Sequence, residues 1–294
     1  MKGRLVVLAA LALVVCLNVY AGQKFRFGVI GDRTGDGDQQ VFEQVIEEMA
    51  THRSDFAINV GDLIQGYTPD SNTVYAQWDT VLNTLQKLDC PIHYVAGNHD
   101  IFDEQSAIIY ETRTGCKPYY SFDYENAHFI ILSNAMPESW TDVEGEQLSW
   151  LKKDLAEHKK ADPIFCFFHK PFWFEALEKN EDDQMHEILR AGGVDCVISG
   201  HQHQFCRTSW DWVKYIVIGS SGGGKGVNEA AGDLYGYALV TVEGGRIEIS
   251  LIEMGNNFLP DNALSFEDVK TARSIEEKHV RIEPVDIRDG TANV

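Results

Sequence analysis

The chain has 294 residues, of which 44% are hydrophobic and 24% are charged, and its formal net charge is −20. This length suffices for a buried core, and the composition excludes a disordered or fibrous protein. The negative charge argues against broad electrostatic binding of nucleic acid. A site for a small phosphorylated molecule stays open, because bound cations reverse the local field.

The first 21 residues differ from the rest of the chain. Lys2 and Arg4 give a basic start, and a largely apolar run follows over residues 5–19. This pattern is typical of a cleavable signal peptide and predicts a periplasmic or secreted protein that begins at Gly22. The run is shorter than the ~20 residues of a spanning helix, so an uncleaved membrane anchor is the weaker alternative. Lipid attachment at Cys16 is disfavoured, because a bulky valine precedes it.

Short apolar runs alternate with helical patterns over the first two-thirds of the chain, and short strands dominate the last third. The patterns predict strands over residues 25–30, 56–60, 92–95, 119–122, 128–132, 164–168, 194–199, 215–218, 237–242 and 247–252. They predict helices over residues 39–50, 73–88, 144–157, 183–191 and 266–279. This order favours an α/β layered fold with mixed sheets. We interpret residues 22–255 as one catalytic domain and residues 256–294 as a C-terminal extension.

Five short polar segments each follow a predicted strand. In chain order they are Gly31-Asp32-Arg33-Thr34, Gly61-Asp62-Leu63, Gly97-Asn98-His99-Asp100, Phe168-His169-Lys170-Pro171 and Gly200-His201-Gln202-His203. The carboxyl ends of strands are where open α/β sheets gather their sites. Carboxylates, an amide and imidazoles suit borderline divalent metals. Each segment alone is commonly structural, so it is the ordered set that indicates a metal centre.

In order and spacing these segments resemble the calcineurin-like metallophosphoesterase superfamily over roughly residues 25–252. The resemblance implies a four-layer sandwich of two mixed β-sheets flanked by helices, with two transition-metal ions (Mn, Fe or Zn) between the sheet edges. It implies that Asp32 and His203 bind one metal, that Asn98, His169 and His201 bind the other, and that Asp62 bridges both. The implied activity is hydrolysis of a phosphate mono- or diester of a small molecule by a hydroxide that bridges the metals.

The same resemblance implies a role for the histidine of the third segment, which faces the leaving group in the family. His99 is therefore the candidate general acid, with Asp100 orienting it. The alternative for His99 is a purely electrostatic clamp on the phosphate. Arg33 is a candidate contact to the substrate phosphate, and a surface salt bridge is an equal alternative.

The chain departs from the family pattern at the first metal site. Many members have a histidine two residues after the first aspartate, where this chain has Thr34. Purple acid phosphatases have a metal-binding tyrosine at the position of Gln65. Asp32, Asp62 and His203 are therefore the expected protein ligands, with water, Gln65 or Thr34 completing the site. An iron–tyrosinate centre is not supported.

Other functions have less support. A non-catalytic exported binding module on the same fold is the main alternative, and the weakened first metal site is its only support. A nuclease is disfavoured, because the chain is acidic and has no basic stripe. Residues 219–225 fit the pattern GxxxxGK, but Gly226 stands where a nucleotide-binding P-loop needs serine or threonine. We interpret this segment as a flexible loop that borders the metal site. The sequence leaves monoester, diester and pyrophosphate substrates open.

Overall fold

The computed structural model describes residues 24–136, 143–279, 287–288 and 291–292. The expected signal peptide and its cleavage point therefore lie outside the described residues. Among the residues that are described, no helix is both long enough and apolar enough to cross a membrane.

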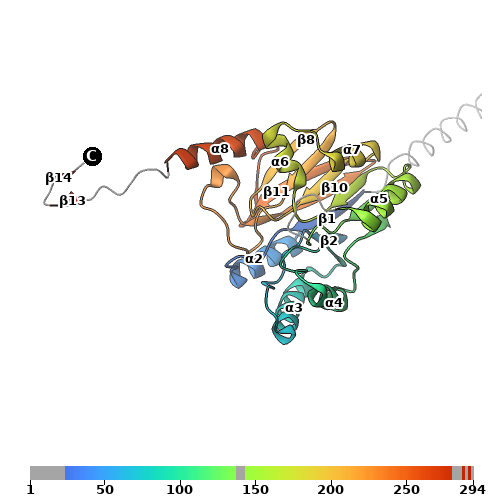
Figure 1. Ribbon diagram of the computed structural model, residues 1–294, viewed down its shortest axis with the longest axis horizontal. Helices are drawn as coiled ribbons and strands as arrows, with labels where there is room; N and C mark the ends of the chain where they lie inside the picture. Colours follow the sequence, from blue (N-terminus) through green and yellow to red (C-terminus); the bar gives the residue numbers. More distant parts are fainter. Residues whose placement is uncertain (1–23, 137–142, 280–286, 289–290, 293–294) are drawn as a thin grey trace, which may run out of the picture.

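Two six-stranded mixed sheets form the centre of the molecule (Figure 1). The first sheet has the order β12-β11-β10-β1-β2-β3 and the second has the order β4-β5-β6-β7-β9-β8. The first contains β1 (Lys24–Ile30), β2 (Phe56–Asn59), β3 (Ile92–Tyr94), β10 (Gly236–Glu243), β11 (Arg246–Glu253) and β12 (Asn257–Phe258). The second contains β4 (Tyr120–Tyr124), β5 (Ala127–Ile131), β6 (Ile164–Phe167), β7 (Cys196–Ser199), β8 (Cys206–Trp210) and β9 (Val213–Val217). In the first sheet the parallel strands β1, β2 and β3 form one side and the antiparallel strands the other. In the second sheet the parallel strands lie in the middle and antiparallel strands form both edges.

The two sheets pack face to face through a core rich in phenylalanine. Phe27 of β1 stacks on Phe56 of β2 with ring centroids 5.1 Å apart. From the opposite sheet, the ring of Phe165 contacts the ring of Phe27 edge-on, with centroids 5.3 Å apart. Because side chains alternate along a strand, the neighbours of these residues point to the outer faces, where helices cover them.

One layer of helices covers each outer face. The first sheet carries α2 (Gln39–Ala50), α3 (Ser71–Leu85) and α4 (Glu104–Thr114), with the short η1 (Gln86–Leu88) after α3. The second carries α5 (Gly145–Glu157), α6 (Phe172–Lys179), α7 (Gln184–Ala191) and α8 (Phe266–His279). The described chain also contains η2 (Glu229–Ala231) and the hairpin β13 (Ile287–Arg288) and β14 (Thr291–Ala292). The predicted four-layer sandwich of two mixed sheets is confirmed.

Helix α8 lies within the segment that the sequence suggested as a C-terminal extension. It buries Phe266 and Val269 beside α6 on the second sheet. Further along the helix, the Arg273 guanidinium lies 5.3 Å from the centre of the Phe174 ring and donates a hydrogen bond of 3.3 Å to Gln202. The helix therefore contacts the loop that carries the last two predicted metal ligands.

Candidate metal centre

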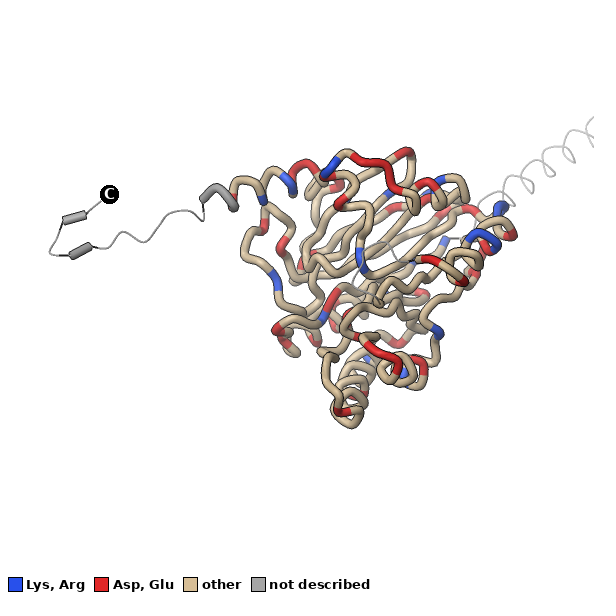
Figure 2. The backbone as a smooth tube through the Cα atoms, viewed as in Figure 1, with Lys and Arg blue, Asp and Glu red and all other residues tan. Residues whose placement is uncertain are grey.

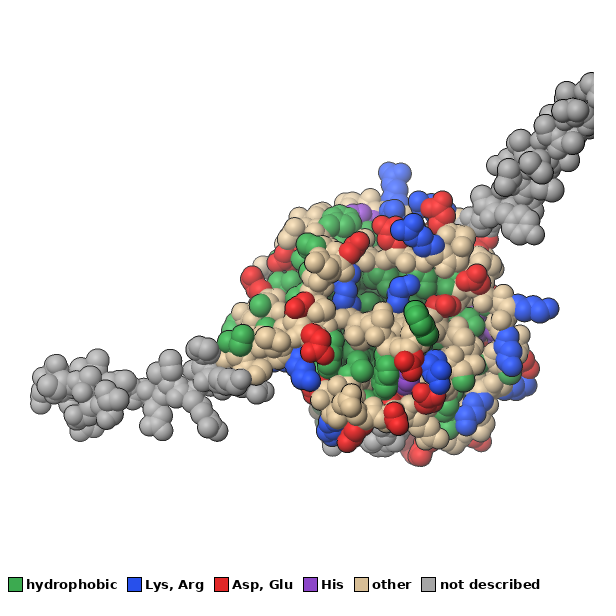
Figure 3. Space-filling model, turned by 90° about the horizontal axis from the view of Figure 1, so that it is seen from above, with side chains coloured by type: hydrophobic (Ala, Val, Ile, Leu, Met, Phe, Trp, Pro, Cys, Tyr) green, Lys and Arg blue, Asp and Glu red, His purple; other side chains and the backbone are tan. Residues whose placement is uncertain are grey.

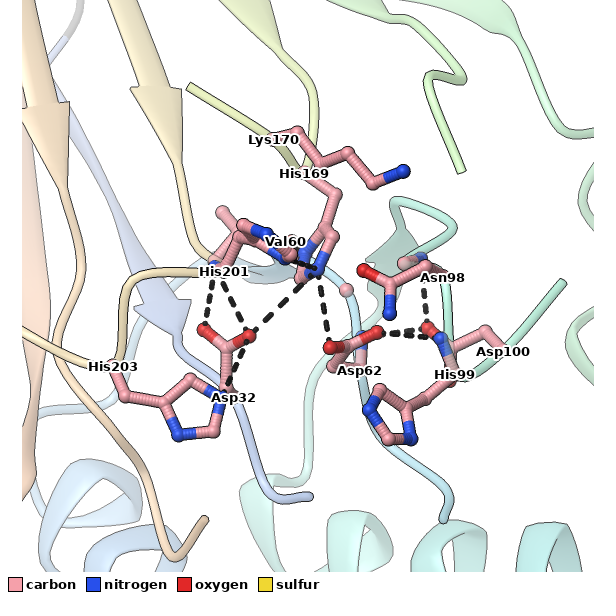
Figure 4. Close-up of polar contacts among 12 residues, drawn as sticks. Asp32, Val60, Asp62, Asn98, His99, Asp100, His169, Lys170, His201 and His203 are labelled. Atoms are coloured by element: carbon pink, nitrogen blue, oxygen red, sulfur yellow. Dashed lines mark hydrogen bonds and ion pairs between the residues drawn. The ribbon is translucent and has the colours of Figure 1, made fainter. Parts of the chain in front are cut away.

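The five polar segments converge where strands of the two sheets end side by side. In the first sheet, Asp32 follows β1, Asp62 follows β2 and Asn98 follows β3. In the second sheet, His169 follows β6, and the segment 201–203 follows β7. Figure 4 shows the six predicted metal ligands around a common space: Asp32, Asp62, Asn98, His169, His201 and His203. The structure thus brings together residues that are up to 171 positions apart in the chain.

Asp32 is fully buried and held from both sides. Its two carboxylate oxygens accept the backbone N–H of His201 at 3.0 and 3.1 Å. Its backbone carbonyl accepts the N–H groups of Ser221 and Gly223 at 2.8 and 3.1 Å. The glycine-rich loop that resembled a P-loop therefore supports the first aspartate.

Asp62 directs its two carboxylate oxygens to different neighbours. Oδ1 accepts the backbone N–H of His99 at 2.9 Å, and Oδ2 lies 3.1 Å from Nε2 of His169. The backbone of Asp62 is in the left-handed region, with φ of 57°. A Cβ atom at Gly97 would lie 2.1 Å from Oδ1 of Asp62, so only glycine permits this approach.

Two groups of ligand atoms share Asp62. One consists of Asp62, His169 and His201, and the other of Asp32, Asp62 and His203. Within each group the ligand atoms lie within 4.8 Å of one another. A carboxylate has two oxygens and can donate one to each of two cations, so the shared aspartate fits a bridged pair of ions.

Hydrogen bonds to backbone carbonyls orient the histidine rings. Nδ1 of His169 donates to the carbonyl of Val60 at 2.8 Å, and Nδ1 of His203 donates to the carbonyl of Gly224. A carbonyl only accepts, so each Nδ1 carries a hydrogen, and Nε2 is the ring nitrogen left to face the other ligand atoms. Metal-binding histidines commonly show this arrangement, in which the second ring nitrogen is tied to a backbone or carboxylate oxygen.

Charge at the centre favours a cation. Burial lowers the pKa of His169, but the charges of Asp62 and Asp32 and the hydrogen bonds to Asp62 and Val60 together outweigh burial and raise the pKa to about 9. Burial, reinforced by the nearby His169, lowers the pKa of His201 to about 3. Nδ1 of His201 lies 3.2 Å from Nε2 of His169, so two ring nitrogens face each other beside a carboxylate. A positive charge is therefore favoured between them, and His201 stays neutral, as a metal ligand must be.

Asn98 provides the clearest sign of a ligand that the described residues do not supply. Its Nδ2 donates to the hydroxyl of Tyr67 at 3.2 Å. Its Oδ1 is buried and has no hydrogen-bond partner among the described residues. An unpaired buried acceptor typically costs ~1–3 kcal/mol, and coordination of a cation would remove that cost.

Thr34 and Gln65, the two residues left open for the first site, lie in different surroundings. Thr34 is buried, and its hydroxyl oxygen has no partner within the described part of the chain. The Gln65 side chain is exposed. Of the two, it is therefore Thr34 that has a buried side-chain oxygen without a partner among the described residues.

The surroundings of His99 and Asp100 differ from the sequence interpretation. Nδ1 of His99 donates to the backbone carbonyl of Gln65 at 2.7 Å, so a carbonyl orients this ring. The buried Asp100 carboxylate instead accepts four backbone N–H groups. They belong to Asp62, Leu63, Ile64 and Gly97, at 2.7, 2.9, 3.2 and 2.9 Å. Asp100 thus fixes the two loops that carry Asp62 and Asn98.

Arg33 is engaged by the protein itself. Its guanidinium donates to the carbonyl of Leu63 at 3.1 Å and to the side chain of Gln39 at 2.5 Å. It also lies 5.4 Å from the centre of the Phe42 ring. These contacts tie the loop after β1 to the loop after β2 and to helix α2.

Two residues near the centre carried no signal that sequence reasoning used. Lys170 is buried directly after His169, and its ammonium donates to the carbonyl of Ala135 at 3.2 Å. Figure 4 shows its side chain alongside the cluster. Tyr67 contacts both Asn98 and His99. Lys170 could have been noticed in the sequence, because it is a charged residue inside a hydrophobic segment. Tyr67 could not, because it lies in an ordinary turn sequence.

Comparison with known proteins gives a consistent picture. Residues 25–205 match the family described as calcineurin-like phosphoesterase. Purple acid phosphatase 18 of Arabidopsis thaliana is 29% identical over 171 residues, which cover 50% of this chain and 38% of that protein. A probable cyclic nucleotide phosphodiesterase of Psychrobacter arcticus is 26% identical over 188 residues, which cover 56% and 63%. The matches thus span less than two-thirds of these relatives.

Solved structures share the fold. A dimetal phosphatase from Danio rerio superposes with a TM-score of 0.51 at 18% identity, over 78% of this chain and 99% of that one. GAP50, described as the anchor in the inner membrane complex of Plasmodium, gives a TM-score of 0.59 at 15% identity, over 92% and 99%. At these identities the similarity concerns the architecture alone.

Proposed function

We propose that this chain, which belongs to the calcineurin-like phosphoesterase family, hydrolyses a phosphate mono- or diester of a small molecule with the help of two transition-metal ions. The observation that carries the proposal is the shared carboxylate of Asp62, which stands in both groups of ligand atoms. The unpaired oxygen of Asn98 is independent support. A scaffold that only recognised a partner would not need either feature.

The ligand set divides around Asp62. We assign Asp32 and His203 to one ion and Asn98, His169 and His201 to the other. When bound, the two cations (Mn, Fe or Zn) would supply a nucleophile from water near neutral pH and neutralise the phosphoryl oxygens. The loop contacts of Asp100 and Arg33 keep the carboxylates at a fixed separation.

His99 is the proposed general acid. Because its Nδ1–H is donated to the Gln65 carbonyl, Nε2 of the protonated ring holds the proton that can pass to the leaving oxygen. His99 stands next to Asn98 in the chain, and its backbone N–H is anchored on Asp62. The ring is therefore fixed beside the proposed metals without being one of their ligands.

A small substrate suits the charge distribution. Acidic residues are spread over both helical layers, with basic residues scattered among them (Figure 2). Such a surface repels a polyanion, whereas a single phosphate group can be attracted locally by cations at the centre. The relatives are named as a phosphatase and a cyclic nucleotide phosphodiesterase, and both names describe enzymes that act on phosphate esters.

The metal dependence tests this proposal directly. The purified chain should contain up to two transition-metal ions and release product from p-nitrophenyl phosphate or its bis ester. EDTA should abolish turnover, and Mn²⁺, Zn²⁺ or Fe²⁺ should restore it. Full activity in EDTA without metal by elemental analysis would contradict the mechanism. Two bound ions without turnover of any ester would favour the non-catalytic binding module.

We also propose that residues 1–21 direct export and are then removed. The basic start, the short apolar run and the residues before Gly22 support this assignment. Mass analysis of the mature protein should find an N-terminus at Gly22 or within a few residues of it. An intact Met1 on the exported protein would show that the segment is not cleaved.

A further inference from the structure

Tyr67 is a large aromatic residue that is exposed yet firmly held. Its side chain is 59% exposed. Its hydroxyl accepts a hydrogen bond from Nδ2 of Asn98 at 3.2 Å. Its ring meets the His99 ring nearly at right angles, with centroids 4.9 Å apart, and lies 5.2 Å from the Phe102 ring. The ring therefore has fixed neighbours on the side of the metal centre and solvent on the other.

The backbone that presents Tyr67 is unusual. Gly66 and Tyr67 both have positive φ, 55° and 47°, and the second is a conformation that a bulky residue rarely adopts. The turn is fixed because Gly66 donates to the Gln77 side chain of α3 at 3.0 Å. A Cβ at Gly66 would lie 2.0 Å from the carbonyl oxygen of His99. The turn is thus in close contact with the segment 97–100 and is hydrogen-bonded to helix α3.

Neither packing in the core nor the hydrogen bond to Asn98 explains why position 67 carries a whole aromatic ring. A core residue would be buried, and hydrogen bonding to Asn98 requires only the hydroxyl. What the ring adds is an exposed aromatic face at the edge of the site, beside the residue proposed to protonate the leaving group. Flat aromatic faces attract other rings by stacking, with little dependence on the detailed chemistry of the partner.

We propose that Tyr67 forms a stacking subsite for an aromatic ring carried by the leaving group, so that the preferred substrates are nucleoside or aryl phosphate esters rather than simple alkyl phosphates. The inference rests on the proposed function, because it places the leaving oxygen near Nε2 of His99. A leaving group bound there extends past His99, whose ring lies 4.9 Å from the Tyr67 ring. The ring takes no part in bond breaking and acts by binding.

A matched pair of substrates isolates this contribution. AMP and ribose 5-phosphate release the same kind of 5′-alkoxide, so proton donation by His99 affects both alike, and only AMP carries a base. The metal-loaded wild type should show a higher kcat/KM for AMP. Tyr67→Leu should lower kcat/KM for AMP by ~5–100-fold, mainly through KM, because stacking contributes equally to ground and transition states. Ribose 5-phosphate should lose much less, and no more than it loses in Tyr67→Phe, which also lacks the hydroxyl bonded to Asn98.

Two further variants separate the ring from the hydroxyl and from general effects. Tyr67→Phe keeps the ring and should keep the preference for AMP. Trp212→Leu is the control, because Trp212 is 97% exposed at the turn between β8 and β9, at the opposite end of the second sheet from His201. This variant should leave kcat/KM unchanged for both substrates. An equal loss on both substrates in Tyr67→Leu, with the ratio unchanged, would overturn the subsite.

Equilibrium binding keeps the inference distinct from the proposed function. Titration of the metal-loaded protein with AMP and with ribose 5-phosphate measures stacking without turnover. Tighter binding of AMP that is lost in Tyr67→Leu supports the subsite even if no ester is hydrolysed. Equal affinities of the wild type for the two compounds would overturn it, whatever the catalytic result.

Discussion

Replacement of Asp62 by alanine should release both metal ions and lower turnover of every phosphate ester by ~10³-fold or more. Asp62 is the one residue that belongs to both groups of ligand atoms near the strand ends. Its removal also frees the Nε2 atom of His169 from its carboxylate partner at 3.1 Å. Because the loss concerns the metals rather than the leaving group, alkyl and p-nitrophenyl esters should suffer alike.

Elemental analysis and kcat on both esters measure this outcome. Asp79→Ala is the matched control, because Asp79 is an exposed carboxylate on α3 paired with Arg113, and such surface pairs contribute little. The control should retain metals, activity and thermal stability. If Asp62→Ala kept two ions per chain, the bridging role would be wrong, and Asp32 would have to be reconsidered as the shared ligand.

Replacement of His99 by alanine should have a different signature. Both metals should remain, because His99 belongs to neither group of ligand atoms. An alkyl alkoxide is strongly basic and needs a proton as it leaves, so kcat on an alkyl ester should fall by ~10²–10⁴-fold. A p-nitrophenolate is a stable anion, so the nitrophenyl ester should lose much less.

His99→Gln sharpens this test. Glutamine keeps a polar side chain but has no titratable proton, so it should show the same dependence on the leaving group as alanine. Equal losses on both esters, with metals retained, would mean that His99 stabilises charge on the phosphoryl oxygens. Rescue by glutamine on the alkyl ester would lead to the same conclusion.

The central strands and the polar turns that follow them could be predicted because local sequence determines them. Residues 25–30 form an apolar run that only Arg26 interrupts, which suits β1, a strand covered on both faces along most of its length. The glycine-rich turns after such strands mark where side chains leave the sheet. In the structure the side chains of all six proposed ligands lie around a common space.

Elements without a clear period were missed. Helix α4 begins at a cap formed by Asp103 and Ser106, but Ile108 on its surface is 58% exposed, so its apolar pattern is blurred. Helix α6 opens with three consecutive buried aromatic residues, 172–174, which is no helical pattern at all. Predicted helix 73–88 is divided in the structure, because α3 ends at Leu85 and the tighter η1 follows.

The contacts of the site could not be predicted, because they join residues from distant turns. The role of the Gln65 carbonyl depends on its distance of 2.7 Å from His99, which no residue type encodes. The same holds for the position of Tyr67, which results from two successive left-handed residues. The resemblance to the family implied Asp100 as a partner of His99, whereas the fold uses its carboxylate to bind four backbone N–H groups.

The position of β1 has a consequence for biosynthesis. It pairs with β2, which follows after a single helix, and with β10, which comes near the end of the described chain. As the chain leaves the ribosome, β1 therefore keeps one unpaired edge until residue 243 has emerged. The unpaired edge of the strand favours binding by chaperones for that time. A chain shortened before β10 would expose this strand permanently and should aggregate.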